Sequence, residues 1–246
     1  MNIAGTGARN RAARRGAAAA AVLIGTLCLA FAPSAARSEP PLKGAILNGI
    51  WARPQGVGNV FKQEETPPYN AEWAKKNQEI QKQRLGQEFD DPSLRCLPFG
   101  MPRMMISATY PFEILVTPGQ ITVIQELDSE VRRIFIDQKH PPAEEERDPT
   151  FEGHSVAHWD GDTLVVDTIN IRSETPIDRL YYPRSDKMHI TERWRLRDRN
   201  TLEVEIVLDD PVAFTRPWST TKRFVRQDGE YIHEYVCAEN NQRVQP

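Results

Sequence analysis

The feature that most constrains the fold is a series of short segments in which apolar and polar residues alternate. Alternation with a period of two places successive side chains on opposite faces of a strand. Neighbouring segments flank Pro118-Gly119, Asp160-Gly161, Arg199-Asn200 and Asp228-Gly229. Such dipeptides suit the tight turns of hairpins. The sequence therefore predicts consecutive hairpins, which together form an antiparallel meander.

About ten segments have this strand pattern. One helix is expected over about residues 70–85, because Pro67-Pro68 precedes it, Glu, Lys and Gln fill its middle, and Gly86 can end it. Its apolar residues are few, so it should lie on the surface. The expected strands are residues 46–53, 112–117, 121–127, 131–136, 151–159, 163–170, 188–197, 201–208, 220–226 and 230–237.

The number of expected strands suggests how the edges of the sheet are paired. An open sheet leaves two unpaired edges, and closure into a barrel removes them. We therefore expect a mainly β chain, with the antiparallel meander closed into a lipocalin-like barrel of about 8–10 strands. A barrel of that size has room for one small ligand. A two-sheet sandwich is the alternative, because periodicity alone does not separate the two.

The N-terminal segment has a different composition. Residues 1–36 contain four arginines and no acidic residue, and an apolar run from Ala17 to Ala32 precedes Ser34-Ala35-Ala36. This is the order of a secretory signal peptide, with cleavage expected after Ala36 or Ser38. The run is shorter than the roughly 20 residues that span a bilayer. We expect a periplasmic or secreted protein without a stable membrane span, folded as one barrel domain over residues 37–246.

Cleavage removes Cys28 and leaves Cys96 and Cys237. In an oxidising compartment two cysteines can form one disulfide. The alternative is a pair of buried free thiols. No Cys-x-x-Cys occurs in the sequence, which argues against thiol-redox chemistry.

Charge and motifs exclude several classes of function. The net charge is −3, so no broad basic surface favours nucleic-acid binding. The sequence has no GxGxxG, P-loop, G-x-S-x-G or HExxH motif. We therefore expect no metal, no cofactor and no nucleic-acid partner.

Two charged residues fall on apolar faces of expected strands. Glu192 is the only charge on a face that is otherwise apolar, so its carboxylate must be paired or have a raised pKa. It is either a general acid/base or part of a structural ion pair with an arginine of a neighbouring strand. Arg132 shares its face with Ile134 and Ile136 and can point inward, where it would hold a carboxylate or phenolate.

Further candidates lie in the segments around these strands. His154 follows Gly153 and is either a proton shuttle near neutral pH or a structural histidine. The loop at residues 98–105 holds three methionines and Arg103, and it forms either a soft apolar lid or simple loop packing. Tyr110 follows this loop, and Tyr235 belongs to an aromatic face of the last segment.

An ordered series of motifs from Ile46 to Asn241 resembles a family of exported bacterial proteins, most of them uncharacterised. The motifs are GMPRMM (100–105), YPFE (110–113), GHS…W-GDTLVVDT (153–168), SDxxHxxER (185–193), DDP (209–211) and EYVCAEN (234–240). Gln138-Lys139 replaces the family's usual Gly-Arg, which makes that loop a poor place for a shared catalytic group. The residues that match the family pattern are His154, Asp167, Asp186, His189, Glu192 and Arg103.

The chain is thereby also similar to cofactor-free lyases and decarboxylases of pathways for lignin-derived phenylcoumaran compounds. The resemblance implies a cofactor-independent lyase or decarboxylase for a small aromatic compound. A phenolic substrate can form a quinone methide that accepts electrons, so the protein supplies only an acid/base, a cation and an aromatic pocket. We assign the acid/base role to His154 or Glu192. Substrate binding is assigned to Arg103, Arg132, Tyr110, Trp194, Tyr235 and His189.

Two other classes of function remain open. A periplasmic barrel can carry a small hydrophobic or aromatic ligand without changing it, which needs the same cavity and no proton chemistry. A structural or envelope-interaction module would have a barrel that side chains fill completely.

Overall fold

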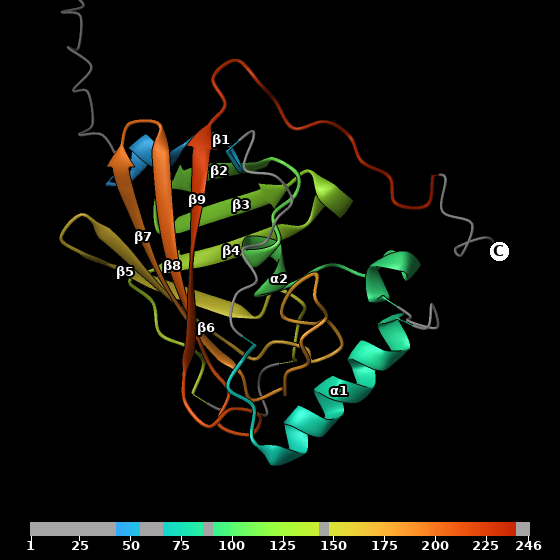
Figure 1. Cartoon of the computed structure of the whole chain (residues 1–246). Helices are drawn as coiled ribbons and strands as arrows, with labels where there is room; N and C mark the ends of the chain where they lie inside the picture. The colour runs from blue at the N-terminus through green and yellow to red at the C-terminus, as the bar shows by residue number, and fades with distance from the viewer. Residues whose placement is uncertain (1–42, 55–65, 86–90, 143–147, 240–246) are drawn as a thin grey trace, which may run out of the picture. The chain divides into compact units, whose positions relative to one another are not determined.

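The computed structural model describes residues 43–54, 66–85, 91–142 and 148–239 (Figure 1). The expected signal peptide lies outside these residues. Nine strands close into one barrel in the order of the chain, with β1 beside β9. They are β1 (Gly49–Ala52), β2 (Phe112–Thr117), β3 (Gln120–Gln125), β4 (Val131–Ile136), β5 (His154–Asp160), β6 (Thr163–Ile169), β7 (His189–Asp198), β8 (Thr201–Asp209) and β9 (Trp218–Arg226). The predicted mainly β barrel is confirmed.

One pair of strands departs from the antiparallel meander. β4 and β5 are parallel, with Phe135 opposite Val156, whereas all other neighbouring pairs are antiparallel. A closed ring in which every strand reverses its neighbour needs an even number of strands. A ring of nine therefore requires a parallel pair, and the long connection between β4 and β5 supplies it by returning the chain before β5 begins.

The strand expected over residues 230–237 does not form. β9 already pairs with β8 on one side and with β1 on the other, so closure leaves no edge for another strand. The chain leaves the barrel after Arg226 and continues without regular structure to Cys237. Figure 1 shows this last segment, in red, running away from β9.

Large side chains fill the interior of the barrel. They come from alternate positions of the strands, as the period of two predicts, and α2 (Arg103–Ile106) adds Met104 and Met105. These side chains take up much of the interior that we expected to hold a ligand, and Trp194 also lines a separate pocket of about 300 Å³. The largest fully buried side chains from the strands are Trp51, Phe112, Trp194, Phe224 and Arg132.

The predicted helix is confirmed as α1 (Ala71–Leu85) (Figure 1). The side chain of Asn70 accepts a hydrogen bond from the Trp73 backbone N–H at 3.1 Å and so caps its first turn. Trp73 is buried, and most other side chains of the helix face solvent. In the described part of the chain, no helix combines the length and the apolar character needed to cross a bilayer.

Three short 3-10 helices complete the described structure. They are η1 (Ala45–Leu47), η2 (Pro92–Arg95) and η3 (Leu127–Ser129). The second and third carry residues that bear on the site described below.

Candidate functional site

The structure distributes the residues assigned from the sequence over three places. One group lines a pocket, one is buried inside the barrel, and one lies on the outer surface of the strands. These groups are, in that order, Arg103, Tyr110 and Tyr235; Arg132, Glu192 and Trp194; and His154 and His189.

Glu192 and Arg132 form an ion pair inside the barrel. Both side chains are fully buried. Arg132 also donates to Ser155 Oγ at 3.2 Å and to Thr168 Oγ1 at 2.9 Å, and Trp194 Nε1 lies 3.3 Å from Glu192 Oε1. Glu192 therefore takes the ion-pair role, although its arginine comes from β4 across the interior and not from a strand next to β7. Because the pair has no contact with solvent, we assign it to the stability of the barrel.

His154 and His189 point outward, and His140 and Asp167 link them on the outer surface. His189 Nε2 bonds to one Asp167 oxygen, and His140 Nε2 lies 3.4 Å from the other. His140 Nδ1 is also 2.8 Å from His154 Nδ1. The hydrogen bond to Asp167 raises the pKa of His189. Within the described ranges, no group of three or more His, Cys, Asp or Glu is arranged to hold a metal ion.

The glycine before His154 has a structural reason that involves no ligand. The glycine has a φ of +68°, and a Cβ atom there would lie 2.7 Å from the backbone oxygen of Ile169. The missing side chain therefore makes room for β6. This removes one reason for placing a substrate next to His154.

The pocket lies outside the barrel and has a volume of about 740 Å³. We call it the tyrosine pocket, because three tyrosines from three separate segments line it. Tyr110 and Tyr235 contact each other edge to face, with ring centroids 5.7 Å apart. Its main lining residues are Asp91, Phe99, Arg103, Tyr110, Leu127, Asp128, Tyr181 and Tyr235.

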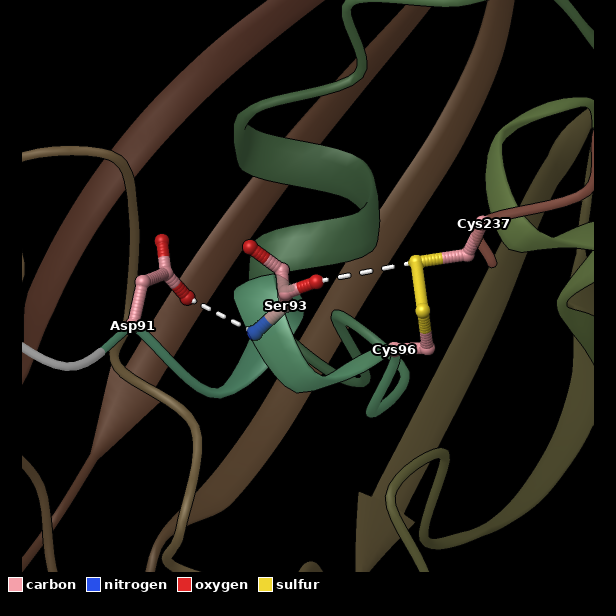
Figure 2. Close-up of a disulfide and its surroundings, with 4 residues drawn as sticks. All are labelled: Asp91, Ser93, Cys96 and Cys237. Atoms are coloured by element: carbon pink, nitrogen blue, oxygen red, sulfur yellow. Dashed lines mark hydrogen bonds between the residues drawn. A yellow bond between two sulfur atoms is a disulfide. The ribbon is translucent and has the colours of Figure 1, made fainter. Parts of the chain in front are cut away.

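A disulfide closes one side of this pocket, and the predicted bond between Cys96 and Cys237 is confirmed. Figure 2 shows the bond beside the turn of Asp91 and Ser93. The Ser93 N–H donates to Asp91 Oδ1 at 3.0 Å, and the Ser93 carbonyl oxygen lies 3.8 Å from Cys237 Sγ. The disulfide thus fixes the C-terminal segment, which carries Tyr235, against η2.

Arg103 forms part of the pocket wall, and its positive charge is balanced by the Asp91 carboxylate. Its two terminal nitrogens donate to the two oxygens of Asp91 at 2.8 and 2.7 Å. Burial opposes ionisation of Asp91, but the hydrogen bonds and charge of Arg103 lower its pKa to about 2. The guanidinium carbon lies 4.1 Å from the centroid of Phe99 and 5.5 Å from that of Tyr181. Arg103 therefore orders the aromatic side chains around it.

Two lining residues, Asp128 and Tyr181, were not predicted from the sequence. Both have left-handed backbone angles, with φ values of 57° and 62°. Such angles are unfavourable for a tyrosine and, among non-glycine residues, are concentrated at functional sites. Burial raises the pKa of Asp128, and its buried Oδ1 has no hydrogen-bond partner among the described residues. A half-buried carboxyl group of this kind keeps its proton to a higher pH than an exposed aspartate does, and it can exchange that proton with a ligand.

The sequence signal for both residues is weak. Leu127-Asp128-Ser129 looks like an ordinary turn between strands, and Tyr181 falls in a segment without periodicity. Comparisons of the chain with protein-family models, with curated proteins and with solved structures find no match. The family resemblance, and the activity that it implies, therefore stay predictions.

Proposed function

We propose that the protein binds a small aromatic compound in the tyrosine pocket, in the periplasm or outside the cell. The observation that carries this proposal is the convergence of Tyr110, Tyr181 and Tyr235 with Phe99 around one pocket of about 740 Å³. A volume of about 300–1,000 Å³ is typical of small-molecule sites. The wall of this pocket combines four aromatic rings with charged and polar side chains. The disulfide that holds the wall supports an oxidising compartment.

The chemistry of the wall favours a phenolic ligand. Tyrosine rings offer faces and edges to a second aromatic ring, and their hydroxyl groups can exchange hydrogen bonds with a phenol. Arg103 is already paired with Asp91. Of the other charged lining residues, Arg179 adds positive charge, whereas Asp128, Glu234 and Glu239 add negative charge. A phenolic dimer with at most one negative charge therefore fits the pocket better than a compound with several negative charges.

Replacing Tyr235 with alanine is expected to weaken binding of a phenolic phenylcoumaran dimer by about fivefold, because one aromatic contact is worth roughly 1 kcal/mol. Isothermal titration calorimetry on residues 37–246 measures the change. Tyr231→Ala is the matched control, because Tyr231 lies in the same segment but is 67% exposed and outside the pocket. Equal affinities for the two variants would contradict the proposed site.

A second candidate function is the cofactor-independent lyase or decarboxylase, and Asp128 is the observation that favours it. His154 and Glu192 lie away from the tyrosine pocket, so we now place the acid/base role on Asp128. Its carboxylate takes the phenolic proton, the ring ether opens to a quinone methide, and the proton passes to the released oxygen. Loss of CO₂ from the substrate carboxylate then returns an electron pair to the ring, which regains its aromatic form as a phenolate.

Asp128→Asn is expected to abolish formation of a conjugated stilbene product while the dimer still binds, because asparagine keeps the shape and tolerates the left-handed angle. Product mass and stilbene absorbance measure the reaction without added metal or nucleotide. Asp137→Asn is the matched control, since Asp137 is exposed and also left-handed, with a φ of 56°. Binding without any mass change in the unmodified protein would leave the carrier function alone.

A further inference from the structure

The inner wall of the tyrosine pocket rests on a buried carboxyl group. Glu130 is only 5% exposed. One of its oxygens accepts a hydrogen bond from the backbone N–H of Phe99, and the other lies 3.3 Å from the backbone nitrogen of Gly100, which donates to it. Phe99 lines the pocket, and α2 begins at Arg103. Glu130 therefore fixes the backbone that carries both an aromatic side chain and the cation of the wall.

A second carboxyl group faces Glu130. Glu152, from the connection between β4 and β5, forms a side-chain hydrogen bond with Glu130. Two carboxyl groups in such contact hold a proton between them, because two buried negative charges at this separation repel each other strongly. The pair thus keeps protons behind the wall of the pocket at a pH where an exposed carboxyl group has lost its proton.

The charged groups around the pair do not neutralise it. Asp128 in η3 adds negative charge next to Glu130, and Arg132 in β4 adds positive charge next to Glu152. The charge of Arg132 is already matched by Glu192. Glu152 Oε2 is buried and has no hydrogen-bond partner among the described residues, so full ionisation of the pair would leave charge on this oxygen without a hydrogen bond.

We infer that protonation of the pair Glu130 and Glu152 holds the wall from Phe99 to Arg103 in place, so that ionisation of both carboxyl groups loosens the wall and weakens ligand binding. The part of the inference that concerns a ligand rests on the proposed function. The part that concerns the wall does not.

The direction of the pH effect follows from the environment of the pair. Burial, and then the charge of the other carboxylate, raises the pKa of Glu130 to about 8, and burial raises the pKa of Glu152 to about 7. An unfolded chain binds fewer protons than this pair in the neutral range, so the pair stabilises the folded state at low pH. That contribution is lost as the pH rises through about 7 to 8.

Hydrogen exchange of the full mature chain measures the wall without any ligand. Between pH 6.0 and 8.5, protection of the peptide at residues 97–106 should fall by about tenfold after correction for the intrinsic pH dependence of exchange. Protection of β8 should stay constant over the same range. Protection of the wall that does not change with pH would overturn the inference.

Two variants test whether this pair is the cause. Glu130→Gln still accepts an N–H bond but does not titrate, and Glu152→Gln removes the second charge. Each should remove most of the pH dependence at residues 97–106, so either one suffices if the other fails to fold. Glu205→Gln, on an exposed position of β8, should change nothing. Unaltered pH dependence in both glutamine variants would exclude the pair as its cause.

Calorimetry with the phenolic dimer at the same two pH values then separates the two claims. Weaker binding by the unmodified protein at pH 8.5, and equal binding at both values by Glu130→Gln, supports the coupling. If the dimer binds at neither pH, the result counts against the proposed function. The exchange result would still decide the inference about the wall.

Discussion

Arg132→Met should lower the free energy of unfolding by about 3–5 kcal/mol, because it leaves the Glu192 carboxylate buried without its cation. Both side chains have zero exposure, so water cannot take over the lost interaction. Ser155 and Thr168 also lose their hydrogen bonds to the guanidinium. Urea denaturation of residues 37–246 measures the change.

Two comparisons make this prediction specific. Arg133→Met removes an exposed arginine of the same strand and should change stability by less than about 0.5 kcal/mol. The double variant Arg132→Met/Glu192→Leu removes both charges and should regain most of the loss. If Arg132→Met is as mild as Arg133→Met, the buried pair does not have the structural role assigned to it.

The second large effect is expected from the double replacement of Cys96 and Cys237 by serine. The disulfide joins residues separated by 141 positions, and the loop-entropy relation gives about 5 kcal/mol for a loop of that length. The segment from Gln227 to Cys237 has no strand pairing, so Tyr235 should also leave the pocket. The variant should therefore unfold at a lower temperature than the unmodified protein, and it should bind the dimer more weakly.

Reduction of the unmodified protein provides an independent comparison. Treatment with a thiol reductant under native conditions should reproduce the loss of dimer binding, while the circular dichroism of the strands stays near its native form. A serine variant that binds the dimer as well as the unmodified protein would show that the disulfide does not organise the pocket.

Much of the barrel could be predicted from the sequence, because strand alternation is a local signal. In β7, Ile190, Glu192 and Trp194 all point inward, as their spacing indicates. The inward orientation of Arg132 follows from the same rule. The residues around α1 likewise carry their own start and stop signals.

The parts that could not be predicted depend on closure and on irregular backbone. Whether residues 230–237 find a strand edge depends on β1, which is distant in the sequence and already pairs with β9. Asp128 and Tyr181 enter the pocket through turns with left-handed angles, and Glu152 lies before β5 in a long connection. No periodicity marks Asp128 or Tyr181, and Glu152 falls in the part of the expected strand over residues 151–159 that lies outside β5, which begins at His154. The candidate site was therefore predicted only in part, through Arg103 and two tyrosines.

The most direct test of the central claim is to locate a bound aromatic compound by photoaffinity labelling. A phenylcoumaran dimer that carries an aryl azide is irradiated with residues 37–246, and the labelled peptides are identified by mass spectrometry. The tyrosine pocket predicts labels within residues 91–110, 127–128, 179–181 and 234–239, removed by excess unmodified dimer. Labels concentrated on the outer surface around His154 and His189, or labels that excess dimer does not reduce, would contradict it.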